Sequence, residues 1–231
     1  MFDSIKMRSA ILKQQRGETA EAKAAYEALY KKGVIQCAYM LPWSVMLLRE
    51  GGKENYQKVK ELLAKAQKAS DINERNRNEL LLDFAVADYK LGNIEQAIAL
   101  LERVHQKSPS GDTYAALGYL YIEQGNLDKA LPFNQAALEY DDEDPIALDN
   151  MAQTYYRLAG NKEKALEYFT KAHEIKPTQI DTLWFLSRYD LDNGKTQDAI
   201  EKLESALEGR FSPLNYKTKA EIEAELARLR G

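Results

Sequence analysis

The sequence is poor in cysteine, proline and glycine, and it has no long apolar run. Its 231 residues include one cysteine, six prolines and twelve glycines. The lone Cys37 excludes a disulfide within the chain, which fits a reducing compartment or a scaffold that needs no cross-links. No stretch approaches the roughly 18 apolar residues that span a bilayer, and residues 1–6 lack the apolar core of a secretory signal. We expect a soluble cytoplasmic chain, or one at the cytosolic face of a membrane if it is a fragment.

The chain also lacks an excess of positive charge. It has 32 Lys and Arg against 36 Asp and Glu, giving a formal net charge of −4. This balance gives no general attraction to phosphate backbones or acidic membranes. Nucleic acid is therefore not expected as a partner. The 45% of hydrophobic residues is enough to bury a long core.

Recognisable catalytic and metal-binding patterns are missing as well. The sequence has no glycine-rich phosphate loop, no nucleophile elbow and no Cys or His pair at metal-ligand spacing. Cys37 is expected to be a small buried apolar residue. The acidic run 141–144 lacks the spacing of a calcium loop, and we expect Asp144 to cap a helix beginning at Pro145. We expect that the chain is not an enzyme and binds no cofactor or metal. Stoichiometric zinc in the purified protein would instead support an enzyme or a metal protein.

What the sequence does contain is a repeat with a period near 34 residues. Four glycines recur at intervals of 33, 35 and 34, and each is followed within six residues by an alanine; the glycines are Gly92, Gly125, Gly160 and Gly194. Such a period indicates that one helix-turn-helix unit is copied along the chain and stacked on its neighbours.

The clearest unit runs from about Ile146 to Gln179. One face of its first helix carries Leu148, Met151, Ala152 and Tyr155, and its second helix carries Ala165, Phe169 and Ala172 before Pro177. Small residues allow close helix approach, while the aromatic residues fill the space between pairs. These spacings resemble the tetratricopeptide repeat. The resemblance implies an all-α, right-handed α-solenoid of about six helix-turn-helix repeats with a C-terminal capping helix.

The resemblance covers nearly the whole chain as a single superhelix, residues 1–231. We expect divergent repeats at about 3–36 and 37–77, clearer repeats at 78–110, 111–144, 145–179 and 180–213, and a capping helix at about 216–230. Thr218 and Glu221 have the spacing of a capping box at the start of that last helix.

In tetratricopeptide arrays the first helix of each repeat lines a concave groove. Its positions two, five, six, nine, twelve and thirteen imply a peptide-binding groove lined by Asp83, Tyr89, Lys90, Tyr119, Ile122, Asp149, Asn150, Gln153, Tyr156, Arg157, Trp184, Phe185 and Arg188. Aromatic anchors among polar groups suit peptide recognition. Two alternatives stay open: Tyr119, Tyr156 and Trp184 pack between first helices, or the two arginines pair with nearby acidic residues instead of a ligand carboxylate.

One function of the family is not expected. Its members that bind chaperone C-terminal carboxylates use Lys, Asn and Arg at set groove positions. The best-matching places hold Ala115 and Tyr119, then Asn150, then Asp181 and Phe185, so only the asparagine agrees.

The resemblance therefore implies a non-enzymatic scaffold or adaptor that binds a peptide or protein segment in the groove. The alternative is a self-associating structural array, or the soluble arm of a membrane-anchored complex. A concentration-dependent mass would separate a homo-oligomer from a monomeric adaptor.

Overall fold

The computed structural model describes residues 2–231, and helices dominate this range. It contains thirteen α-helices, one π-helical turn and no β-strand between residues 2 and 231. The expected all-α fold is confirmed. The chain divides into two compact units, one ending at Val104 and the other running from His105 to Gly231. That boundary lies inside a helix, and the prediction of a single superhelix stays a prediction.

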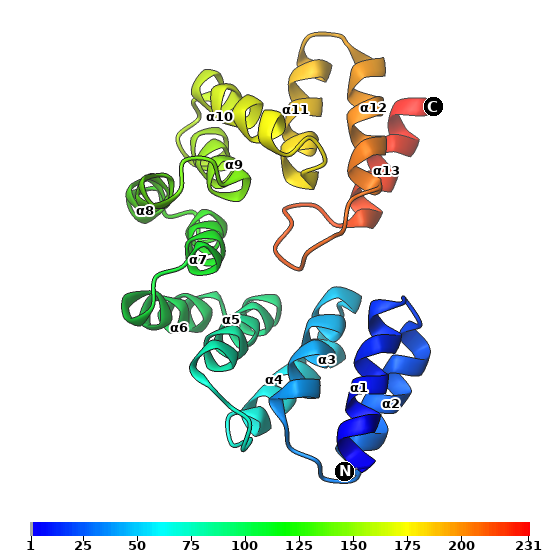
Figure 1. Ribbon diagram of the computed structural model, residues 1–231. Helices are drawn as coiled ribbons and strands as arrows, with labels where there is room; N and C mark the ends of the chain where they lie inside the picture. The colour runs from blue at the N-terminus through cyan, green and yellow to red at the C-terminus, as the bar shows by residue number, and fades with distance from the viewer. Residues whose placement is uncertain (1) are drawn as a thin grey trace. The chain divides into compact units, whose positions relative to one another are not determined.

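The first unit is built from helical hairpins (Figure 1), and aromatic rings stack in its core. Its helices are α1 (Phe2–Gln15), α2 (Thr19–Lys31), α3 (Cys37–Glu50), α4 (Lys53–Ala66), α5 (Glu74–Lys90) and most of α6 (Ile94–Lys107). The ring of Tyr26 stacks on Tyr39 and on Trp43, with centroids 6.2 and 6.0 Å away. Cys37 is fully buried and its Sγ donates to the carbonyl of Ala66, as expected for a structural cysteine.

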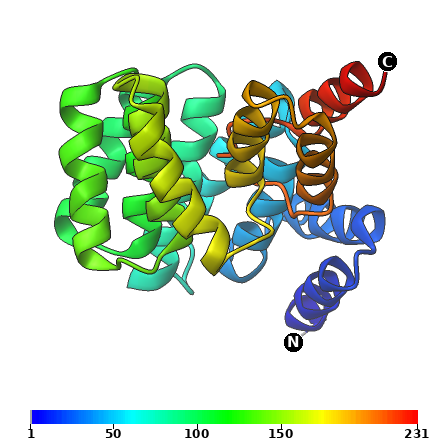
Figure 2. The ribbon, with the colours of Figure 1, turned by 90° about the horizontal axis from the view of Figure 1, so that it is seen from above.

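The second unit holds three hairpins and a terminal helix (Figures 1 and 2). Its elements are α7 (Gly111–Glu123), α8 (Leu127–Tyr140), α9 (Pro145–Gln153), the π-helical turn η1 (Thr154–Leu158), α10 (Lys162–Ile175), α11 (Ile180–Asp192), α12 (Thr196–Leu207) and α13 (Lys219–Arg230). Helix α13 packs against α12, and its Ile222 and Leu226 join the core cluster that contains Leu203. The predicted capping box at Thr218 and Glu221 is confirmed.

Turns between paired helices follow the repeat pattern. Gly125 and Gly194 both have φ of 74°, a left-handed conformation that glycine adopts without a Cβ penalty. The next helix then starts with a side-chain cap where Asn126 accepts from the backbone N–H of Lys129 at 3.0 Å. Asp144 likewise accepts from the N–H of Ile146 at 2.9 Å, so the predicted cap before Pro145 is confirmed.

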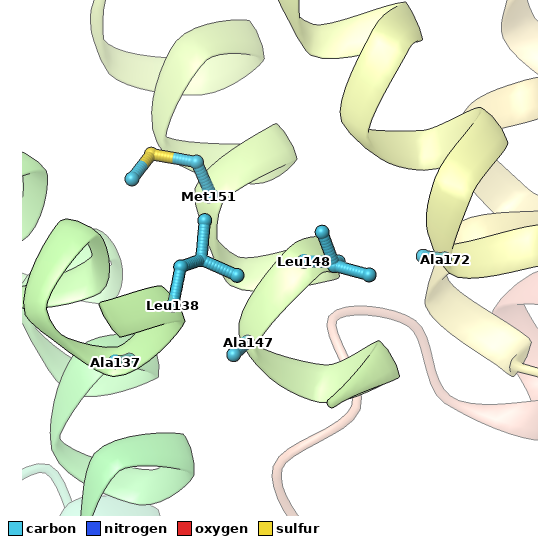
Figure 3. Close-up of a cluster of buried hydrophobic side chains, with 6 residues drawn as sticks. All are labelled: Ala137, Leu138, Ala147, Leu148, Met151 and Ala172. Carbon is cyan, nitrogen blue, oxygen red and sulfur yellow. The ribbon is translucent and has the colours of Figure 1, made fainter. Parts of the chain in front are cut away.

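The core between successive hairpins is formed by the periodic apolar residues. Figure 3 shows Leu148 and Met151 on α9 lying near Leu138 of α8, with Ala172 of α10 beyond Leu148. Met151 and Ala172 have no exposed surface. Residues that the repeat pattern places on one helix face are therefore the residues that hold neighbouring hairpins together.

Helix α9 passes into the π-helical turn η1, which the repeat pattern did not predict. The glycine spacing shows that this repeat has one extra residue, because the interval from Gly125 to Gly160 is 35 residues whereas the next interval is 34. The extra residue falls in the first helix of this repeat, and a π turn accommodates one additional residue without ending the helix. Each residue turns a helix by about 100°, so Tyr156 and Arg157 point differently from their counterparts in an uninterrupted α-helix.

A close approach between α7 and α8 requires a glycine. A Cβ on Gly118 would lie 3.2 Å from Cγ of Asn134 and still closer to its Oδ1. Asn134 stands where the family pattern has an aromatic residue, and it is fully buried, with its Nδ2 donating to Thr154 Oγ1 at 3.0 Å. The absence of a side chain at Gly118 and the buried amide of Asn134 thus replace aromatic packing at this position.

Over residues 2–231, no helix is long and apolar enough to cross a membrane. The same described range contains no cluster of three or more His, Cys, Asp or Glu side chains that would hold a metal ion.

Candidate functional site

A recessed cavity in the second unit combines open volume with buried polar groups. Its volume is about 350 Å³, within the range of ligand pockets. Its walls come from three consecutive first helices, α7, α9 and α11, and from the C-terminal loop, residues 208–218, which links α12 to α13. We name this cavity the carboxylate pocket after Asp149 and Asp181, which both line it.

Asp149 lies on α9 and is only 3% exposed. Its Oδ1 accepts from Thr182 Oγ1 and its Oδ2 from Gln153 Nε2, each at 2.6 Å. Burial disfavours the charged form and raises the pKa of Asp149 to about 6, although these hydrogen bonds oppose the shift.

Asp181, in the first turn of α11, is 6% exposed. Its Oδ1 accepts from the backbone N–H of Tyr216 in the C-terminal loop at 3.0 Å. Burial, followed by the negative charge of Asp149, raises the pKa of Asp181 to about 8. The pocket thus holds two carboxyl groups that disfavour each other's ionisation.

Amide side chains complete the polar wall of the pocket. Gln179 Nε2 donates to the carbonyl of Pro145 at 2.8 Å, but its buried Oε1 has no hydrogen-bond partner. Asn150 Nδ2 donates to the carbonyl of Ala115 at 3.0 Å, linking α9 to α7. The Oε1 of Gln179 is therefore an acceptor that is held in place and unused.

The C-terminal loop packs on the face formed by η1 and α11, and Figure 1 shows it reaching back from α12 and α13 toward α11. The ring of Tyr216 stacks on Phe185 at 5.1 Å, with the guanidinium of Arg157 4.2 Å from the Tyr216 centroid. Lys217 Nζ lies 5.4 Å from the ring centroid of Trp184. The loop therefore covers several of the predicted groove residues.

The two predicted groove arginines form ion pairs within the chain. Arg157 pairs with Glu123 at 2.7 Å, and Arg188 pairs with Glu225 of α13 at 2.5 Å. Together with Arg228, Arg188 lowers the pKa of Glu225 to about 2. The alternative of pairing with acidic residues of the chain is the one observed.

The comparison with known proteins identifies the repeats. The sequence profile of the tetratricopeptide repeat family matches residues 79–111 and again residues 111–178. Residues 79–178 are tetratricopeptide repeats. A tetratricopeptide repeat protein from Parabacteroides merdae has a similar structure, with a TM-score of 0.80 and 13% identity over 99% of this chain and 84% of that one.

Two further similarities concern parts of the chain. YrrB, a tetratricopeptide repeat protein with an unusual peptide-binding site, is 26% identical with a TM-score of 0.52, covering 74% of this chain and 85% of its own. Human Superkiller complex protein 3 is 29% identical over 114 residues, which is 48% of this chain and 7% of that relative. This chain therefore matches only a small part of the human protein. Tetratricopeptide repeat proteins are generally non-enzymatic scaffolds for protein–protein interaction, and this fold supports that general role.

The structure brings three predicted groove residues of the tetratricopeptide repeats together. Tyr119 from α7 and Asp149 and Asn150 from α9 all line the carboxylate pocket. Each is at most 4% exposed, because the pocket is recessed behind the C-terminal loop. Their role in binding a peptide stays a prediction.

Other predicted groove residues are buried in the protein interior, and their role in lining a groove stays a prediction. Phe185 is 2% exposed because it stacks between Phe169, 4.9 Å away, and Tyr216. Gln153 is fully buried because it bridges Asp149 and Arg157, and Ile122 is 1% exposed. These side chains support the wall of the site.

The remaining predicted residues are partly exposed. Tyr156 packs edge-on against Phe185 and Tyr189, the alternative of packing between first helices, whereas Trp184 is half-buried under the guanidinium of Arg188 at 4.1 Å. Asp83, Tyr89 and Lys90 lie on α5 in the first unit, where burial raises the pKa of Asp83 to about 7.

Sequence reasoning missed the pocket residues Gln179 and Asp181, and it missed Tyr216, whose backbone N–H donates to Asp181. Gln179 directly precedes α11 and Tyr216 lies in a non-repetitive loop, so no groove position of the repeat includes them. Asp181 is position two of its repeat when counted from Ile180, and position two is a groove position of the family. This position was the one signal in the sequence that could have identified Asp181.

Proposed function

We propose that this chain is a non-enzymatic adaptor that binds a peptide or protein segment on the face formed by α7, α9, α11 and the C-terminal loop. The observation that carries the proposal is the carboxylate pocket, where Tyr119 of α7 lies with polar side chains from α9 and α11. An aromatic ring within a small set of fixed polar groups offers both contact area and orientation to a ligand. A cytoplasmic location, or a place at the cytosolic face of a membrane, belongs to the same proposal.

Two features support binding at this face and not at the second helices of the hairpins, α8, α10 and α12. The pocket is walled by first helices that belong to separate hairpins, so its shape is held by the packing of the repeats. The polar groups are fixed by hydrogen bonds such as that from Asn150 to Ala115, so a ligand would not have to order them. YrrB provides a precedent for peptide binding in a similar protein.

The test is a peptide-display selection on the immobilised protein, followed by fluorescence anisotropy with the selected peptides. Tyr119→Ala should weaken binding by about tenfold or more, as expected for an anchor residue. Tyr140→Ala is the matched control, because Tyr140 on α8 is 56% exposed and lies outside the pocket lining. It should change affinity by less than about twofold.

Thermal melts of both variants establish that they are folded. Selected peptides that bind folded Tyr119→Ala as tightly as the wild type would contradict the assigned face. Self-association is the competing hypothesis, and light scattering over a range of concentrations tests it, because the adaptor should keep the mass of one chain.

A further inference from the structure

The carboxylate pocket contains two buried carboxyl groups that form no ion pair with a cation of the described residues. Asp149 and Asp181 are both more than nine-tenths buried, and they accept hydrogen bonds from neutral donors, namely hydroxyl, amide and backbone groups. Buried carboxylates are normally paired with a cation or coordinated to a metal. Within residues 2–231, neither carboxylate forms an ion pair.

The basic side chains nearest to the pocket are engaged elsewhere or exposed. Arg157 pairs with Glu123 and Arg188 with Glu225. Lys176 and Arg210 line the pocket, but both are exposed, and neither forms an ion pair with Asp149 or Asp181 in the described part of the chain. Arg157 lowers the pKa of Asp149 through its charge, but no cation of the described residues forms an ion pair with either carboxyl group.

Gln179 gives an independent indication of a ligand. It is 8% exposed, it lines the pocket, and its Oε1 accepts no hydrogen bond although its Nε2 is used. A buried acceptor without a partner carries a desolvation cost that a donor group entering the pocket would offset. Two carboxyl groups and one amide oxygen therefore favour a ligand that donates several hydrogen bonds and carries a positive charge.

We propose that the carboxylate pocket binds the cationic head group of a lysine or arginine side chain presented by a peptide or protein partner. This inference rests on the proposed function and specifies the chemistry that the site recognises. Ammonium and guanidinium groups have three and five donors and no acceptor, which matches a wall of acceptors. Their aliphatic stems suit the apolar part of the lining, which includes Ile146, Ile180 and Leu214.

A divalent cation fits the pocket less well. Calcium takes about six to eight oxygen ligands, whereas two carboxylates and one amide oxygen supply at most about five. The described residues also contain no group of three or more His, Cys, Asp or Glu side chains that could hold a metal ion. Calcium binding is therefore kept as an outcome of the test.

The experiment is a ¹⁵N NMR titration of the full chain with small probes. The probes are N-acetyl-lysine methylamide, its arginine analogue, and the norleucine analogue, which keeps the aliphatic stem but lacks the charge. The lysine and arginine probes should shift the backbone amide signals of Asp149, Asn150 and Asp181, while the norleucine probe should leave them in place.

Two substitutions complete the design. Asp181→Asn keeps the shape of the side chain and should weaken binding of the lysine probe by about tenfold or more. Asp142→Asn, at an exposed position in the turn before α9, is the matched control and should have less than about a twofold effect. The comparison of lysine with norleucine on the wild-type chain needs no variant, so the test stands even if Asp181→Asn is poorly folded.

Several results would overturn the inference. They are equal shifts with norleucine, no shifts with any probe, unchanged lysine binding in folded Asp181→Asn, or stronger shifts of the same signals with calcium chloride. Selected peptides that need Tyr119 but contain no Lys or Arg would refute the inference and leave the adaptor function standing. Lysine-specific shifts without any peptide or protein partner would instead refute the adaptor function alone.

Discussion

Replacing Gly118 with alanine is the substitution whose effect the structure specifies most closely. The added Cβ would enter the contact between α7 and α8, 3.2 Å from Asn134 Cγ and 3.3 Å from Asn150 Nδ2. Asn134 has no exposed surface into which it can move, and its Nδ2 is bonded to Thr154 Oγ1. The alanine can be accommodated only if the helices separate or the amide rotates away from Thr154.

The expected cost follows from three opposing effects. Alanine is favoured over glycine in a helix interior by up to about 1 kcal/mol. Overpacking a tight contact costs about 1–3 kcal/mol, and a buried amide that loses its hydrogen bond costs about 1–3 kcal/mol more. The free energy of unfolding should therefore fall by about 1–5 kcal/mol, although intrinsic helix propensity alone predicts a gain.

Urea unfolding followed by circular dichroism measures this change, and Gly111 provides the control. Gly111 is also on α7, but a Cβ there would meet nothing within 4 Å, so Gly111→Ala should be neutral or slightly stabilising. Shortening the obstructing side chain in Gly118→Ala/Asn134→Ala should recover part of the loss. The reasoning is refuted if Gly118→Ala is as stable as the wild type, or if both glycine substitutions have the same effect.

Three further predictions concern the pocket and the C-terminal loop. Because the pKa of Asp181 is raised to about 8 in the folded chain, its stabilising contribution is complete below the ordinary carboxyl pKa and is lost as pH rises through 8. The loss of folding free energy is about 1.4 kcal/mol for each unit by which the folded pKa exceeds the unfolded one. Asp181→Asn has no carboxyl group to titrate, so this substitution should raise the melting temperature more at pH 8 than at pH 5. An equal effect at both pH values would show that the carboxyl is not perturbed. Tyr216→Ala removes the ring between Phe185 and Arg157, so limited proteolysis should cut residues 208–218 faster while helix content stays the same; an unchanged cleavage rate would mean that the ring does not hold the loop. Thr218→Ala removes the capping box of α13 and should cost about 1 kcal/mol in urea unfolding, whereas Thr218→Ser should cost little.

The repeat core could be predicted from the sequence because its contacts are periodic. Ala152, Ala165 and Phe169 stand at positions that the pattern marks as small or aromatic, and all three are fully buried. Each such contact joins a helix to its nearest neighbours, so spacing along the chain is enough to find it. The glycine interval of 35 residues before Gly160 also contained the signal for the π turn, had the extra residue been assigned to a helix.

The candidate site was harder to predict because its wall is not periodic. The C-terminal loop places Tyr216 beside Asp181, 35 residues earlier in the chain, and no repeat position encodes that contact. For the same reason the repeat pattern could not show that the ring of Tyr216 covers Phe185. Three residues of the groove pattern, Tyr119, Asp149 and Asn150, line one cavity, but the pattern could not show which other side chains close it.

Hydrogen exchange with mass spectrometry, with and without a peptide selected on the wild-type protein, tests the central claim most directly. Binding at the face formed by α7, α9, α11 and the C-terminal loop should slow exchange in these elements, above all around Asp149, Asp181 and Tyr216. Tyr119→Ala should lose this protection, and Tyr140→Ala should keep it. Slower exchange confined to the second helices of the hairpins, α8, α10 and α12, would contradict the account.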